Sequence, residues 1–282
     1  MTHDVFKNRK LLIASMHQKD HVIAPLLEKI YGIRSFINTE LNTDLLGTFS
    51  GEIERNDDPL TSARKKCLLG MEISGADLAI ASEGSFGPHP SIFFIPAHEE
   101  IMILIDKKNN IEITAQLLST DTNFSGTEVH LKDALLAFCE QVKFPSHGLI
   151  FKNTQHHFTE IDKGICSYNE LNHLFDKYIS KYGSVFVETD MRAMFNPTRM
   201  KNIELLTEKL IIKMNTQCPN CKIPGFSVTE RKAGLPCQLC DLPTQSTWKH
   251  ISICKHCQYQ ETIEFPDGKE FEDPMYCDFC NP

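Results

Sequence analysis

The chain has 282 residues, 41% of them hydrophobic and 23% charged, so it can form one large domain or two moderate ones, each with a buried core. Its formal net charge of -8 argues against a general nucleic-acid binder, because such a protein needs a basic surface to displace counterions from phosphates. The start, Met1 to Lys10, is polar and no stretch is long and apolar enough for a membrane span, so we expect a cytoplasmic protein without membrane contact.

The first hundred residues alternate short runs typical of strands with segments of helical periodicity. Asp20 is the predicted N-cap of a helix that ends at Gly32, and Asp58, followed by proline, caps a second helix that ends at Gly75. The predicted strands lie at residues 11–14, 35–38 and 78–81.

The alternation continues over the next hundred residues. A hairpin is predicted from 101–105 and 111–117, and Ser167 with Glu170 forms a capping box. Helices are expected at residues 131–142, 167–183 and 197–214, and a late strand is expected at residues 185–187. The pattern predicts an α/β fold with a mixed sheet flanked by helices, in a body of residues 1–214 that carries the candidate catalytic site.

Residues 215–282 contain eight of the 11 cysteines, arranged in four Cys-x-x-Cys pairs. Two thiolates separated by two residues reach one ion, and two such pairs complete the tetrahedral site that structural zinc prefers. Four thiolates leave no open coordination position, so we expect two structural zinc ions in a small double zinc-ribbon-like module. The ligands are Cys218, Cys221, Cys237, Cys240, Cys254, Cys257, Cys277 and Cys280.

The spacing leaves the combination of the pairs open. Gaps of 15 residues (222–236) and 19 residues (258–276) favour pairing the first pair with the second and the third with the fourth, and interleaved pairing is the alternative. The other cysteines, Cys67, Cys139 and Cys166, lie among apolar or mixed residues and are expected to be buried as small hydrophobic side chains.

Polar residues follow the predicted strands, where ligands gather in open α/β sheets. Glu83 and Asp190 follow buried strands, and Asp44 and His89 lie in loops, so these four are the catalytic candidates. Glu83 suits a Mg²⁺ ligand or a general base, and the structural alternative is a carboxylate that accepts hydrogen bonds from loop N–H groups.

Four further residues are candidates for binding a substrate phosphate. His17 and Lys19 precede the first long helix, whose N-terminal N–H groups can hold an anion, and Arg192 follows the late strand. Arg199 lies in the first turn of the last helix, where a cation is unfavourable next to the helix dipole unless it meets an anion. A solvated Lys19 and a local ion pair between Asp190 and Arg192 are the structural alternatives.

Several long motifs resemble a bacterial family known as a domain of unknown function, which implies an α/β body followed by a zinc module. The motifs are GTFSGEIER (47–55), ASEGSFGPHP (81–90), ETDMRAMFNPTRM (188–200), CPNCKIPGF (218–226), GLPCQLCDLPT (234–244) and CDFCNP (277–282). A more remote similarity links segments 14–19, 62–67 and 81–84 to the phosphate-binding opening, the lysine-bearing helix and the acidic strand end of inosine triphosphate pyrophosphatase-like enzymes.

Together these observations favour a Mg²⁺-dependent hydrolase acting on a phosphorylated small molecule or nucleotide. The alternative is a non-enzymatic adaptor whose zinc ribbon binds a protein or RNA partner. A nucleic-acid processing enzyme is a third reading, and it requires a local basic groove.

Overall fold

The structure, a computed structural model, describes residues 3–41 and 57–282. The chain divides into two compact units, one of residues 6–105 and 114–210 and the other of residues 1–5, 106–113 and 211–282. In the described part of the chain, no helix is long and apolar enough to cross a membrane.

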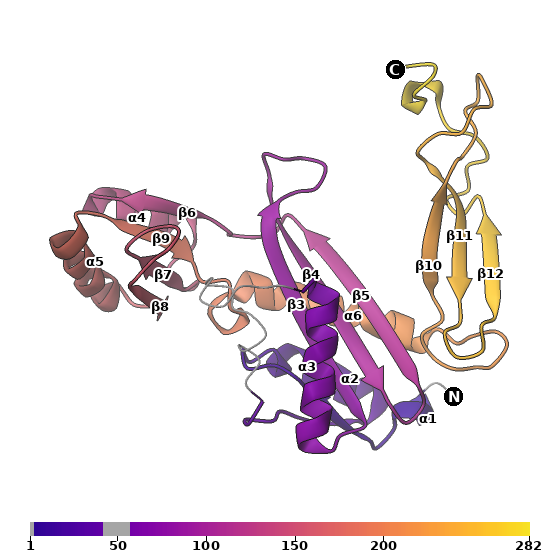
Figure 1. The fold of residues 1–282 in the computed structure, drawn as a ribbon, viewed down its shortest axis with the longest axis horizontal. Helices are drawn as coiled ribbons and strands as arrows, with labels where there is room; N and C mark the ends of the chain where they lie inside the picture. Colours follow the sequence, from indigo (N-terminus) through magenta and orange to yellow (C-terminus); the bar gives the residue numbers. More distant parts are fainter. Residues whose placement is uncertain (1–2, 42–56) are drawn as a thin grey trace. The chain divides into compact units, whose positions relative to one another are not determined.

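The first unit contains a five-stranded mixed sheet in the order β2-β1-β3-β4-β5, of which Figure 1 labels β3, β4 and β5. The strands β1 (Lys10–Ile13), β2 (Arg34–Phe36) and β3 (Leu78–Pro88) run parallel. Short connections join β3 to β4 (Pro96–Asp106) and β4 to β5 (Ile111–Ser119), which makes these neighbours antiparallel hairpins. The predicted mixed sheet and its hairpin are thereby confirmed.

Two helices connect the parallel strands. α2 (Asp20–Tyr31) ends at Gly32, and α3 (Pro59–Ser74) ends at Gly75; both glycines are left-handed and donate to a carbonyl in the last turn. Asp58 caps α3 by accepting hydrogen bonds from two backbone N–H groups, as predicted. The prediction for Asp20 was wrong, because Lys19 occupies the N-cap position of α2 and makes no side-chain capping bond. A short helix, α1 (His3–Phe6), precedes β1.

The late strand does not join this mixed sheet. β9 (Val185–Thr189) belongs to a separate antiparallel sheet with β6 (Gly126–Val129), β7 (Leu149–Lys152) and β8 (Ile161–Ile165), in the order β6-β9-β7-β8. β9 is antiparallel to both of its neighbours, β6 and β7, and these pairings assign it to the second sheet.

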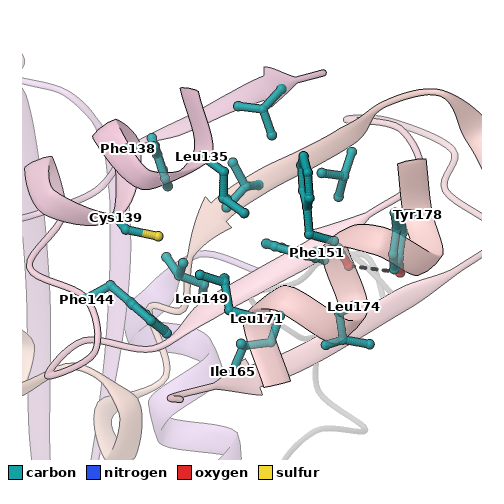
Figure 2. Close-up of a cluster of buried hydrophobic side chains, with 14 of the residues drawn as sticks. Leu135, Phe138, Cys139, Phe144, Leu149, Phe151, Ile165, Leu171, Leu174 and Tyr178 are labelled. Atoms are coloured by element: carbon teal, nitrogen blue, oxygen red, sulfur yellow. Dashed lines mark hydrogen bonds between the residues drawn. The ribbon is translucent and has the colours of Figure 1, made fainter. Parts of the chain in front are cut away.

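A compact core joins the second sheet to α4 (Lys132–Gln141) and α5 (Tyr168–Tyr182) (Figure 2). Phe151 and Leu149 of β7 pack with Leu171 of α5, and the Tyr178 hydroxyl donates to the Phe151 carbonyl at 3.4 Å. This core fixes the carboxyl end of β9, from which the chain continues through a short 3-10 turn (Ala193–Phe195) into α6 (Pro197–Asn215).

The second unit contains a three-stranded antiparallel sheet of β10 (Val228–Ala233), β11 (Thr247–Ile253) and β12 (Gln260–Glu264), with β11 in the middle (Figure 1). A single 3-10 turn (Pro274–Tyr276) precedes the last pair of cysteines. The loops that join and flank these strands carry the four Cys-x-x-Cys pairs.

Candidate functional site

The eight paired cysteines form two four-thiol clusters that could each hold a metal ion. Cys218, Cys221, Cys254 and Cys257 make one cluster, and Cys237, Cys240, Cys277 and Cys280 make the other. The shortest sulfur–sulfur distances across each cluster are 3.7 to 3.8 Å. A tetrahedral zinc ion with bonds of about 2.3 Å requires a separation of about 3.8 Å, so the thiol geometry fits a zinc module.

Each Cys-x-x-Cys pair with its turn is called a knuckle. The knuckles combine in the interleaved way, so the favoured sequential pairing was wrong. One strand lies between each consecutive pair of knuckles, and neighbouring strands run antiparallel. Consecutive knuckles therefore lie at opposite ends of the sheet, and alternate knuckles meet. At about 3.3 Å per residue, even the five-residue β12 separates its ends by about 16 Å, far beyond the reach of two thiolates that share an ion.

The first three knuckles fold as the same turn. The residue directly after the second cysteine is left-handed, with φ of 62° at Lys222, 57° at Asp241 and 61° at Gln258, and its N–H donates to the carbonyl of the first cysteine. Phe226 and Tyr259 pack against the thiols of the first cluster, and their ring centroids lie 5.9 Å apart. The knuckle geometry is thus set by backbone bonds before any ion is considered.

The three unpaired cysteines are divided between core and surface. Cys67 and Cys139 are buried, as predicted. Cys166 is exposed, so its predicted burial was wrong. It directly follows β8, an edge strand of the second sheet, where the chain turns toward α5.

A second constellation lies in the first unit, around the fully buried carboxylate of Glu100 on β4. Arg199 of α6 donates from Nε at 3.1 Å and from Nη2 at 3.0 Å to Glu100 Oε2, and Lys19 Nζ lies 3.1 Å from Oε1. Burial alone would raise the pKa of Glu100, but the charges of Arg199 and Lys19 and a hydrogen bond from His98 outweigh it and hold this pKa well below its usual range. Glu100 is therefore a carboxylate at neutral pH.

The neighbours of Glu100 are themselves oriented by further hydrogen bonds. Asn202 donates from Nδ2 to His98 Nδ1 at 3.1 Å, so His98 carries its proton on Nε2 and donates it to Glu100 over 2.8 Å. The Phe86 ring stacks on His98 with centroids 4.4 Å apart and lies 5.4 Å from the Arg199 guanidinium. This packing holds the polar groups of β4 and α6 in one arrangement.

Lys19 is buried and directed inward. Its ammonium group donates to the Ser82 carbonyl at 2.7 Å and to the Ser82 hydroxyl at 3.0 Å, in addition to Glu100. Burial lowers the pKa of Lys19 to about 8, although the charge of Glu100 acts in the opposite direction.

The next residue of β3, Glu83, forms an ion pair with Lys66 of α3. Both side chains are largely buried. The expectation that Glu83 follows the end of a strand was wrong, because β3 continues to Pro88 alongside β4.

Positive charge dominates the surroundings of His17, which follows β1. Burial, followed by the charges of Lys19, Arg199, Arg192 and Lys66, lowers the pKa of His17 to about 3. Four cationic side chains, from the N-cap position of α2, from α6, from the segment after β9 and from α3, thus act on one imidazole.

A family model described as domain of unknown function (DUF6671) matches residues 66–282. The chain belongs to this family. This confirms the resemblance drawn from the motifs. Comparison with curated proteins found no match. Among solved structures, the chain is similar to the crystal structure of protein VC0702 from Vibrio cholerae, at 9% identity and a TM-score of 0.31, over 73% of this chain and 94% of that one.

The structure places the remaining candidates as follows. Asp190 is fully buried, and its carboxylate accepts hydrogen bonds from Arg192 Nε at 3.0 Å and Nη2 at 2.6 Å. His89 lies in the β3–β4 loop, where its Nδ1 accepts from the N–H groups of Ser91 and Ile92. Asp44 lies outside the described residues.

Sequence reasoning missed Glu100 and His98. Both precede the apolar run from Ile101, at which the predicted strand began. Alternation would have found them, because His98, Glu100 and Met102 share one face of β4 and all three are buried.

The interleaved pairing predicts which cysteines release the same ion. The double variant Cys218→Ser/Cys257→Ser should lose one metal ion per chain and keep the other, because both residues belong to one cluster. Cys218→Ser/Cys240→Ser should lose both ions. Elemental analysis of the purified variants measures the number of metal ions per chain. Sequential pairing would instead cost the first variant both ions and the second variant only one.

Gly84 is predicted to be required where β3 passes the Glu100 pair. A Cβ at this position would overlap Glu100 Oε2 and lie 2.7 Å from Arg199 Nη2, so Gly84→Ala should lower the free energy of unfolding by about 1–3 kcal/mol. Gly87→Ala is the matched control, because its Cβ meets nothing within 4 Å. Far-UV circular dichroism in urea follows the helical body. Equal midpoints for the two variants would contradict the prediction.

The depressed pKa of His17 predicts a pH dependence of stability. Between about pH 6.5 and the folded-state value of about 3, the unfolded chain binds a proton that the folded chain rejects. This contribution is fully present above pH 6.5 and declines by up to about 1.4 kcal/mol per pH unit as the pH falls. Urea unfolding between pH 6.5 and 4.5 should therefore be less steeply pH-dependent in His17→Gln than in the wild type, and parallel curves would refute the effect.

Proposed function

We propose that the body, residues 1–214, binds a phosphorylated small molecule beside His17 and hydrolyses it, with a nucleotide as the leading candidate. The observation that carries this proposal is the group of four cationic side chains whose charges act on His17 and whose ion pairs are largely buried. Only three carboxylates, those of Glu83, Glu100 and Asp190, pair with these cations in the described part of the chain. A phosphate would supply the negative charge that this arrangement favours.

The four cations divide into two groups. Arg199 and Lys19 donate their hydrogen bonds to Glu100, Ser82 and the Met191 carbonyl. They therefore supply positive charge and link β3, β4 and α6. Lys66 and Arg192 are the more exposed pair. Among the described residues, the Lys66 ammonium group forms an ion pair with Glu83 only, and the Nη1 group of Arg192 has no protein acceptor, so both retain donors for a phosphate.

Glu83 is the carboxylate we assign to the chemistry. Apart from the cysteine clusters, no group of three potential metal ligands occurs in the described part of the chain. Mg²⁺ often uses one or two protein carboxylates together with substrate phosphates, so a magnesium ion would arrive with the phosphates and take Glu83 as a ligand. The cation would neutralise charge on the phosphates while the basic side chains hold the substrate for attack by water.

The three segments similar to inosine triphosphate pyrophosphatase-like enzymes support the same assignment. They contain Lys19 and Ser82, which hydrogen bonds join to Glu100, and Lys66, which forms an ion pair with Glu83, the residue after Ser82. Asp190 and His89, together with Asp44, remain candidates for a supporting role.

We assign zinc to both four-thiol clusters. Thiolates are soft ligands that select zinc over the hard cations, and four of them leave no position for a substrate, so both ions are structural. A module that depends on reduced cysteines suits a reducing compartment such as the cytoplasm.

The test compares neighbouring lysines of α3. Wild-type protein is screened for turnover of inorganic pyrophosphate and of nucleoside triphosphates, including deaminated ones, with and without Mg²⁺. Lys66→Ala should lower kcat/KM by about tenfold or more because a charge-assisted contact to the phosphate is lost. Lys65→Ala, which removes an exposed lysine paired with Asp57, should stay close to the wild type. Glu83→Gln should abolish Mg²⁺-dependent turnover while leaving the circular dichroism spectrum unchanged.

Binding is measured independently of turnover. A bound pyrophosphate should raise the pKa of His17, because it offsets the positive charge around the imidazole, and nuclear magnetic resonance of the ring protons reports this. Absence of turnover together with an unchanged His17 titration would overturn the proposal. Binding without turnover would leave a phosphate-binding protein in place of a hydrolase.

A further inference from the structure

The two cysteine clusters carry different side chains at equivalent positions of their knuckles. In the first cluster, the residue before the second cysteine of each pair is polar, Asn220 in one and His256 in the other. In the second cluster the same positions hold Leu239 and Phe279, which are 72% and 66% exposed. Because both clusters are built from the same Cys-x-x-Cys spacing, metal binding alone does not require apolar side chains there.

More exposed apolar residues lie next to the second cluster in sequence. Leu242 follows its first knuckle, Met275 and Tyr276 precede its last knuckle, and Phe271 lies shortly before them; all four are exposed. The first cluster differs, since Phe226 is buried against its thiols and Tyr259 packs beside it. Exposed apolar residues gathered around one point of a small domain are typical of a surface that binds another protein.

The charges around the second cluster restrict the partner. Residues 234–246 and 266–282 contain six carboxylates and one lysine, whereas residues 215–233 and 247–265 contain three carboxylates and five basic residues. Five of the six carboxylates are exposed: Asp241, Asp267, Glu270, Asp273 and Asp278. An acidic border repels the phosphates of RNA and attracts lysine and arginine.

We propose that the second cluster of the module, with Leu239, Tyr276 and Phe279 at its centre, binds a protein segment that presents apolar side chains between lysines or arginines. The apolar residues supply the contact area, and the acidic border supplies orientation and a fast encounter. The first cluster then serves the fold of the module, and the second also serves recognition. This function is independent of phosphate binding in the body.

The test uses variants that copy the first cluster onto the second. Leu239→Asn and Phe279→His introduce the residues that the first cluster already carries at these positions, so the full-length chain should keep two metal ions. A random peptide library is selected on the metal-loaded wild-type chain, and the affinities of enriched peptides are measured by fluorescence anisotropy. We expect peptides with both apolar and basic residues, a loss of affinity of about tenfold or more in the double variant, and weaker binding at high salt.

Ile263→Thr is the matched control, because Ile263 is an exposed apolar residue on β12 of the same module, and this variant should bind like the wild type. Several outcomes would overturn the proposal: no enriched peptide, enriched peptides without basic residues, or equal affinity in the double variant. Self-association abolished by the double variant would assign the surface to a second copy of the chain, and RNA binding abolished by it would assign the surface to nucleic acid.

Discussion

The first unit depends on one buried carboxylate, that of Glu100. Arg199 reaches it from α6 and Lys19 from the start of α2, while Ser82 of β3 and His98 of β4 complete its hydrogen bonds. Moving such groups out of water costs several kcal/mol for each ion, and the cost is recovered only when every charge is paired and every lone pair is used. Glu100 meets both conditions. Removing it would leave two buried cations without a partner, and losses of this kind amount to about 3–5 kcal/mol.

This network also determines which groups remain for a ligand. Glu100 keeps the Arg199 and Lys19 side chains buried, and protein acceptors use their N–H groups. Their positive charges therefore raise the electrostatic potential at His17 without providing donors to a ligand. Lys66 and Arg192 have one carboxylate partner each and retain unused donors in the described part of the chain. A phosphate would exchange these carboxylate contacts for stronger ones to a multiply charged anion. In this proposal the fully buried pairs of Glu100 supply positive potential, and the slightly more exposed Lys66 and Arg192 supply the contacts to the ligand.

Local signals in the sequence were sufficient for most elements of the body. Asp58 with the following proline, Ser167 with Glu170, and the glycines at 32, 75 and 183 marked helix ends that the structure confirms, because each acts within one turn of the chain. Long-range partnerships were harder to predict. β9 is as apolar as a strand of the mixed sheet, and only its partners β6 and β7 assign it to another sheet. Alternation along β4 marks Glu100 as facing inward, but its partner Arg199 lies 99 residues later in the chain and only the fold brings the two together.

The cysteine pairing was missed for a different reason, because the sequence did contain the answer. Each gap between knuckles can hold one strand, and a single strand between two knuckles sends them to opposite ends of an antiparallel sheet. An odd number of intervening strands therefore forbids sequential pairing, and an even number would permit it. The same parity gives the module two ends with separate four-thiol clusters, so side chains can change at one end without altering the thiols of the other. The polar Asn220 and His256 at one end and the exposed Leu239 and Phe279 at the other are consistent with that independence. The Cys-x-x-Cys spacing is the same at both ends and does not account for the exposed apolar residues at one of them, whereas a partner outside the module would.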